Sequence, residues 1–226
     1  MPELETRYPC PVCLGVMMEK TPVGEKAPVL LDHCPRCGGA WFELGEVQQL
    51  RQVRPEDLWK RIAPRAEVQR ASCHSCHTPM DRSAASCPTC GQPNLLDCPV
   101  CEQTMQVASY EGLRLDSCAR CKGIWFDHHE LSAIWKLELN AALNRHRDRT
   151  GSALADNAGA VVLLDALTWN PGLVFYGAHA AGQLAGAGAS ALSNAPEAAG
   201  AVVEAAGEAA VGVFELIMEI IAGFFD

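Results

Sequence analysis

The stretch CARCKGIWFDHHEL, residues 118–131, is a second copy of the stretch CPRCGGAWFELGEV, residues 34–47. Each copy opens with a C-x-x-C pair and continues with a glycine, a tryptophan, a phenylalanine and a glutamate in the same register. The matched pairs are Cys34/Cys118, Cys37/Cys121, Gly39/Gly123, Trp41/Trp125, Phe42/Phe126 and Glu46/Glu130. Because chance does not easily keep so many positions in register, the sequence indicates an internal duplication.

All twelve cysteines of the 226-residue chain fall in C-x-x-C pairs. The first ten residues, MPELETRYPC, contain neither a basic start nor an apolar run, so we expect no secretory signal and a cytoplasmic location. In that reducing compartment such pairs indicate metal sites rather than disulfide bonds. Neighbouring pairs then combine into three predicted zinc sites. Their ligands are Cys10, Cys13, Cys34 and Cys37; Cys73, Cys76, Cys87 and Cys90; and Cys98, Cys101, Cys118 and Cys121.

Each outer site has the features of a zinc ribbon. Four thiolates satisfy a tetrahedral zinc ion, and two C-x-x-C knuckles deliver them with little strain. Between the knuckles of the last site, VASYEGLRLDS at residues 107–117 alternates apolar and polar residues around Glu111-Gly112, which predicts a short hairpin. We expect Gly39 and Gly123 to allow a tight turn after the knuckle, and the following tryptophans to cap a small core.

The middle set, within CHSCHTPMDRSAASCPTC at residues 73–90, leaves one alternative open. His74 and His77 stand beside cysteines and are candidates to replace one of them as a ligand. Four cysteines are favoured, because CPTC is an intact knuckle and four thiolates suffice.

The outer modules resemble the transcription factor zinc-finger family, whose ribbons are similar to that of general transcription factor IIB. The resemblance covers residues 8–50 and 96–135 and implies a zinc-ribbon fold without an assigned chemistry. In the second copy it is carried by Cys98, Cys101, Asp116, Cys118, Cys121, Gly123, Trp125, Asp127, Glu130 and Leu131. In the first copy it is carried by Cys10, Cys13, Asp32, Cys34, Cys37, Gly39, Trp41, Glu43 and Glu46, with Val47 in place of the leucine.

A catalytic interpretation of the histidines and cysteines is weaker than a structural one. His128 and His129 lie near a metal site, but four cysteines leave no open coordination position, so we expect a solvated first helical turn there. Dithiol exchange by C-x-x-C pairs is the redox alternative, and it usually needs a single exposed pair on a thioredoxin-like frame. The sequence therefore predicts that the protein is not an enzyme.

Charge divides the chain at Arg149, which is its last Lys or Arg, although eight acids follow and the net charge is −9. Basic residues gather in 51–70 and 145–149, where contact with nucleic-acid phosphates is an alternative to a solvated surface. The tail is rich in Ala and Gly, and turn signals at 168–172 and 193–197 divide it into three expected helices. In the last of these, acids alternate at spacings of seven and four, which places them in one stripe; they are Glu197, Glu204, Glu208, Glu215, Glu219 and Asp226.

The sequence does not decide whether the tail lies in a membrane or packs in water. Membrane association through residues 150–226 is one hypothesis. Residues 166–196 contain no Asp, Glu, Lys or Arg and include a G-x-x-x-G pattern from Gly182 to Gly186, which membrane helices use for close packing. Asn170, Pro171 and the weak hydrophobicity of Ala and Gly favour soluble helical packing or self-association instead.

The predicted fold is a series of small metal-stabilised modules followed by an all-α tail. The expected divisions are a first ribbon at 1–50, a helical basic linker at 51–70, a four-cysteine knuckle at 71–95, a second ribbon with its helix at 96–149, and the tail at 150–226. We expect three structural zinc ions and a function in binding a protein partner, as an adaptor with a helical tail for assembly or anchoring. The alternative function is nucleic-acid binding in a transcription-related role.

Overall fold

The computed structural model describes residues 7–24, 29–43, 46, 49, 55–62, 70–110, 113–151, 158–169 and 196–223. The chain divides into two compact units. The first comprises Met1–Arg54, Glu67–Glu130 and Met218–Asp226, and the second comprises Pro55–Ala66 and Leu131–Ile217. All twelve cysteines and all the described strands belong to the first unit.

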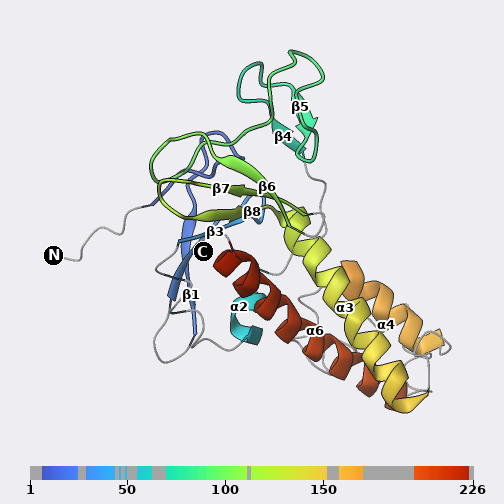
Figure 1. Ribbon diagram of the computed structural model, residues 1–226. Coiled ribbons are helices and arrows are strands. Elements are labelled where there is room, and N and C mark those ends of the chain that lie inside the picture. The colour runs from blue at the N-terminus through green and yellow to red at the C-terminus, as the bar shows by residue number, and fades with distance from the viewer. Residues whose placement is uncertain are drawn as a thin grey trace. The chain divides into compact units, whose positions relative to one another are not determined.

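Both ribbons contribute to one six-stranded antiparallel sheet in the order β1-β2-β3-β8-β7-β6 (Figure 1). The first ribbon supplies β1 (Glu19–Val23), β2 (Val29–His33) and β3 (Ala40–Phe42). The second supplies β6 (Gln106–Tyr110), β7 (Leu113–Ser117) and β8 (Ile124–Phe126). The predicted hairpin is confirmed, because β6 and β7 pair from Gln106↔Ser117 to Tyr110↔Leu113. Its turn, at 111–112, lies outside the described residues.

The two ribbons meet at the centre of the sheet, where β3 pairs with β8. Trp41 lies opposite Trp125 in this pair, so equivalent residues of the two copies face each other. Equivalent strands paired in this way follow the pattern of a two-fold interface within a single chain. The sequence predicts two separate ribbon modules, whereas the structure joins them into one sheet and one core.

The middle knuckle folds around a two-stranded sheet of β4 (Arg70–Ser72) and β5 (Pro79–Asp81). Its own buried core consists of Cys73, Met80 and Cys87. A core of this size is too small to fold alone without a metal or another support.

The second unit contains α2 (Pro55–Ile62), α4 (Ala158–Trp169) and most of α3 (His128–Thr150) and α6 (Pro196–Gly223). Helix α4 ends at the predicted turn signal, and α6 begins with a proline, which suits the first turn of a helix. The Trp135 indole of α3 donates a 3.0 Å hydrogen bond to the Leu167 carbonyl of α4. Figure 1 shows α3, α4 and α6 side by side, in yellow, orange and red.

The acids of the α6 stripe whose side chains are described differ in exposure, because Glu208 is half-buried and pairs with Arg149 of α3. Glu204, Glu215 and Glu219 are exposed, whereas the apolar residues between them are largely buried. No helix in the described part of the chain is long and apolar enough to span a membrane. The G-x-x-x-G pattern and the expected middle helix of the tail lie outside the described residues.

Candidate metal centres

The structure brings each predicted set of four cysteines together. Within each set the four Sγ atoms lie within 4.8 Å of one another. The Cys10–Cys37, Cys76–Cys87 and Cys101–Cys118 Sγ atoms are each 3.6 Å apart. Tetrahedral zinc with Zn–S bonds of about 2.3 Å requires sulfur separations of about 3.8 Å, whereas a disulfide requires about 2 Å. The donor sets therefore fit three structural zinc ions, and all twelve cysteines are free thiols.

The knuckles share one backbone turn, which explains the two-residue spacing. In five of the six, the residue after the second cysteine has a positive φ and donates its amide N–H to the carbonyl of the first cysteine at 2.9 Å. These five residues are Gly38, His77, Gly91, Glu102 and Lys122. Amide groups also donate to sulfur, as from Cys121 N to Cys118 Sγ at 3.3 Å. Such bonds stabilise thiolates. The shared turn places the sulfur atoms of each set around a common centre.

The middle cluster gathers four sulfur atoms without a histidine. His77 occupies the left-handed position of its knuckle, with φ 58°, and both His77 and His74 are exposed. Neither belongs to the group that could hold a metal, which consists of the four cysteines. An all-cysteine site is therefore the arrangement that the geometry favours.

Local hydrogen bonds lower the pKa of several thiols, Cys76 and Cys101 among them. Hydrogen bonds with the Thr78 side chain and backbone lower the pKa of Cys76 to about 6. A backbone hydrogen bond from Gln103 lowers the pKa of Cys101 to about 7. Zinc binds the deprotonated form, so these shifts favour metal binding near neutral pH.

Gly39 and Gly123 are needed for a different reason from the one that the sequence suggests. Neither has a positive φ; that conformation falls on the preceding residue, Gly38 or Lys122. Instead, a Cβ atom on Gly39 would lie 2.1 Å from Cζ2 of Trp125, and one on Gly123 would lie 2.1 Å from Cζ2 of Trp41. Each tryptophan thus covers the glycine of the other ribbon, and both indoles are fully buried.

Residues 9–52 and 97–136 each match the family model described as Transcription factor zinc-finger. Over these two stretches, here called the zinc-finger domains, the chain is similar to that family. Neither the curated proteins nor the solved structures gave a match. The two matched stretches contain the outer cysteine clusters, and the middle knuckle lies between them.

The acidic residues after each tryptophan act as caps in both zinc-finger domains. The amide of Asp127 donates to Glu130 Oε2 at 2.7 Å, and that of Glu43 donates to Glu46 Oε2 at 3.0 Å. This is the half of a capping box in which the third helical residue reaches back to the cap. Burial raises the pKa of Glu130 well above its usual value and that of Glu46 to about 7.

His128 and His129 do not form the solvated turn that the sequence predicts. Both side chains are half-buried, and the His128 ring lies 3.0 Å from the place of a Cβ on Gly38. Burial lowers the pKa of His129, which favours its neutral form. The neighbouring metal group consists of four cysteine sulfurs and includes neither histidine.

The second zinc-finger domain contains a buried acidic cluster that the sequence pattern does not predict. Asp116, Asp127 and Glu130 place carboxylate oxygens within 4.8 Å of one another, and all three are buried. Arg82 of the middle knuckle enters this cluster, pairing with Asp116 and, through Nε at 2.9 Å, with Asp127. Because arginine is always charged, Arg82 places a fixed positive charge between Asp116 and Asp127. Arg82 carries no local sequence signal that predicts this role.

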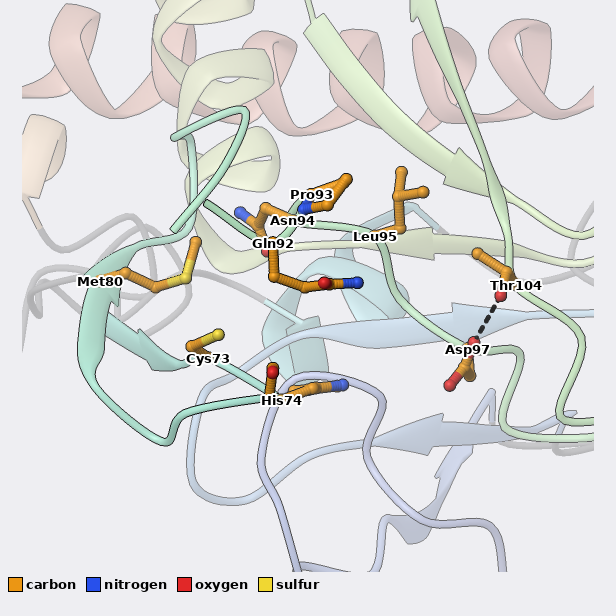
Figure 2. Close-up of a pocket in the computed structure, with 10 residues that line it drawn as sticks. Cys73, His74, Met80, Gln92, Pro93, Asn94, Leu95, Asp97 and Thr104 are labelled. Atoms are coloured by element: carbon orange, nitrogen blue, oxygen red, sulfur yellow. Dashed lines mark hydrogen bonds between the residues drawn. The ribbon is translucent and has the colours of Figure 1, made fainter. Parts of the chain in front are cut away.

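A cavity of about 380 Å³ lies beside the middle cysteine cluster, within the first unit (Figure 2). Its apolar lining includes Met80 and the Leu95 side chain, which is 42% exposed. At one end Thr104 Oγ1 donates to Asp97 Oδ1 at 2.9 Å. Apolar side chains beside a few polar groups are typical of a site that binds another molecule.

Proposed function

We propose that the protein is a zinc-dependent protein-interaction module, in which structural zinc ions hold the ribbons as a rigid binding surface. The observation that carries this proposal is the closure of each candidate metal site by four sulfur atoms. A zinc ion so coordinated has no position left for a substrate or a reactive water. Its contribution is folding free energy, which small modules need because their cores are small.

The cavity beside the middle knuckle supports a peptide as the bound group. Leu95 and Met80 offer apolar contact, and Gln92 and Asp97 offer polar contact, along one short groove. A peptide segment with one large apolar side chain matches this lining. Leu95 is exposed and Met80 is buried, so Leu95 would be the main apolar contact for such a peptide.

Nucleic-acid binding is the competing function, and the ion pairs of α3 weaken its basis. Arg149 pairs with Glu208 at 2.7 Å, and Arg145 approaches the same carboxylate at 3.6 Å. Two of the three arginines at 145–149 thus pair with a carboxylate of α6, which leaves less positive charge for phosphates. In the other basic segment, Arg61 is exposed on α2, while residues 51–54 and 63–69 lie outside the described part of the chain.

The test compares partner capture by three full-length chains: the native protein, Leu95→Glu and Leu137→Glu. Leu137 is also an exposed leucine, at 49%, but lies on α3 in the second unit and serves as the matched control. Capture from an extract of the source cell is followed by binding of the purified partner. We expect Leu95→Glu to weaken that binding at least about tenfold, as for an interface anchor, and Leu137→Glu to leave it unchanged.

Labelled DNA and RNA are tested in parallel at several salt concentrations. Salt-dependent binding that is lost when Arg51, Arg54, Lys60 and Arg61 are reversed in charge would favour the nucleic-acid function instead. Partner binding that survives zinc removal would contradict the requirement for metal-stabilised ribbons.

A further inference from the structure

We propose that the middle knuckle is a metal-dependent clamp, which supplies through Arg82 the cation that the second ribbon lacks in its own hairpin. The two ribbons are copies, yet the ion pairs and the Arg114 hydrogen bonds that hold the knuckle come from the second one. Comparison of equivalent positions in the two hairpins explains this difference. The inference requires a metal in the middle cluster and is independent of any partner.

In the first ribbon the buried aspartate is neutralised from within the hairpin. Asp32 is fully buried, and Lys20 Nζ lies 2.9 Å from its Oδ2. Lys20 is the direct cross-strand partner of Asp32 in the β1–β2 pair, so the two side chains lie on one face of the sheet.

In the second ribbon the equivalent position carries no charge. Asp116 matches Asp32, and its direct cross-strand partner in the β6–β7 pair is Val107. Val107 is 40% exposed, whereas Asp116 is buried. A buried carboxylate without a cation is strongly unfavourable, and Arg82 meets this need from outside the hairpin.

A second substitution adapts the same hairpin to the knuckle. Arg114 of β7 donates to the Asn94 carbonyl at 2.8 Å and to the Ala84 carbonyl at 3.3 Å. The equivalent residue of the first ribbon is Leu30, which has no such donor. Asn94 in turn donates to the Arg82 and Ala84 carbonyls, both at 2.8 Å. The second ribbon is thus specialised to receive the knuckle.

The position of Arg82 depends on the middle cysteine cluster. Arg82 directly follows β5, and the knuckle core around it consists of Cys73, Met80 and Cys87. Cys90 of this cluster is exposed, unlike any cysteine of the outer clusters. The middle knuckle is therefore the most accessible of the three sites, and loss of its metal would release Arg82 from Asp116.

The experiment uses the full-length, zinc-loaded chain and measures hydrogen–deuterium exchange of the β6–β7 amides. Arg82→Ala should raise exchange in this hairpin about tenfold or more. Adding Val107→Lys, which recreates the lysine of the first ribbon, should bring exchange back to within about twofold of the native value. Val107→Gln, which adds no charge, should not restore the native exchange rate in the Arg82→Ala background. Arg120→Ala, at an exposed arginine of the same ribbon, should leave β6–β7 exchange unchanged.

The metal arm replaces Cys73 and Cys76 by serine. We expect the same rise in β6–β7 exchange and the same rescue by Val107→Lys. In the native background Val107→Lys should leave the β6–β7 amides protected, because Asp116 then has a second cation beside it.

Three results would overturn the clamp. They are an unchanged hairpin in Arg82→Ala, an unchanged hairpin after loss of the middle metal, and failure of Val107→Lys to rescue either variant. If Arg82→Ala does not fold, the double variant must fold, and its failure to do so would also overturn the proposal.

Discussion

Trp125 occupies the space that the side chain of any residue other than glycine would need at position 39. Cζ2 of Trp125 lies 2.1 Å from the place of a Cβ on Gly39, and Trp41 has the same relationship to Gly123. Because the two contacts are reciprocal, they hold β3 against β8 at the centre of the sheet. The two zinc-finger domains therefore share one sheet and one buried core.

Alanine at either glycine should destabilise the protein. We expect Gly39→Ala and Gly123→Ala each to lower the free energy of unfolding by about 1–3 kcal/mol, as overpacking of a core typically does. Urea denaturation of the zinc-loaded protein measures this change. Gly207→Ala is the control, since nothing lies within 4 Å of a Cβ there, and in a helix it should be neutral or slightly stabilising.

The clash at Gly39 should be relieved by a smaller ring on the other ribbon. We expect Gly39→Ala combined with Trp125→Phe to be less destabilising than the sum of the two single changes, by about 1 kcal/mol. A double-mutant cycle in urea measures the coupling. For Gly39→Ala combined with Trp41→Phe, the two changes in the free energy of unfolding should add more nearly. If the changes for Gly39→Ala and Trp125→Phe added equally well, the packing of Trp125 on Gly39 of the other ribbon would be contradicted.

The cysteine sets, the β6–β7 hairpin and the start of α6 could be predicted, because spacing, alternation and proline act within short stretches of chain. The pairing of β3 with β8 could not. A duplicated motif shows that two modules exist, but Trp41 could equally cover its own glycine or that of the other copy. The role of Arg82 is hidden for a similar reason, since its partners lie 34 and 45 positions away.

Glu46 should make stability depend on pH. Burial raises its pKa to about 7 in the folded protein, above the value of 4.5 that it starts from. The native state therefore binds the proton more tightly, and the contribution of Glu46 to stability falls as the pH rises from about 4.5 to about 7. Glu46→Gln removes this pH-dependent contribution and keeps an acceptor for the Glu43 amide. The free energy of unfolding of the variant should therefore rise relative to that of the native protein between pH 6 and pH 8.

Urea denaturation at pH 6, 7 and 8 checks this expectation. Lower pH is avoided because protonation of the cysteines releases zinc. Glu19→Gln, at an exposed position of β1, is the matched control and should follow the native profile. If the free energies of unfolding of Glu46→Gln and of the native protein changed in parallel with pH, the raised pKa of Glu46 would be contradicted.

Chelation should unfold residues 8–125. We expect loss of the near-ultraviolet signal of the buried tryptophans and loss of amide protection throughout the sheet, because each small core depends on its metal. Adding zinc back should restore both signals, whereas magnesium, which prefers oxygen ligands, should not. Ribbon strands that stay protected after verified zinc removal would refute a structural role for the metal.

The most direct test of the account is the number of zinc ions and masked thiols in the native protein. Native mass spectrometry with elemental analysis gives the metal count, and thiol titration with and without a chelator gives the accessibility of the twelve cysteines. We predict three zinc ions per chain, with thiols that react fully only after chelation. Disulfide bonds without bound zinc would contradict the structural-zinc account and support redox chemistry instead.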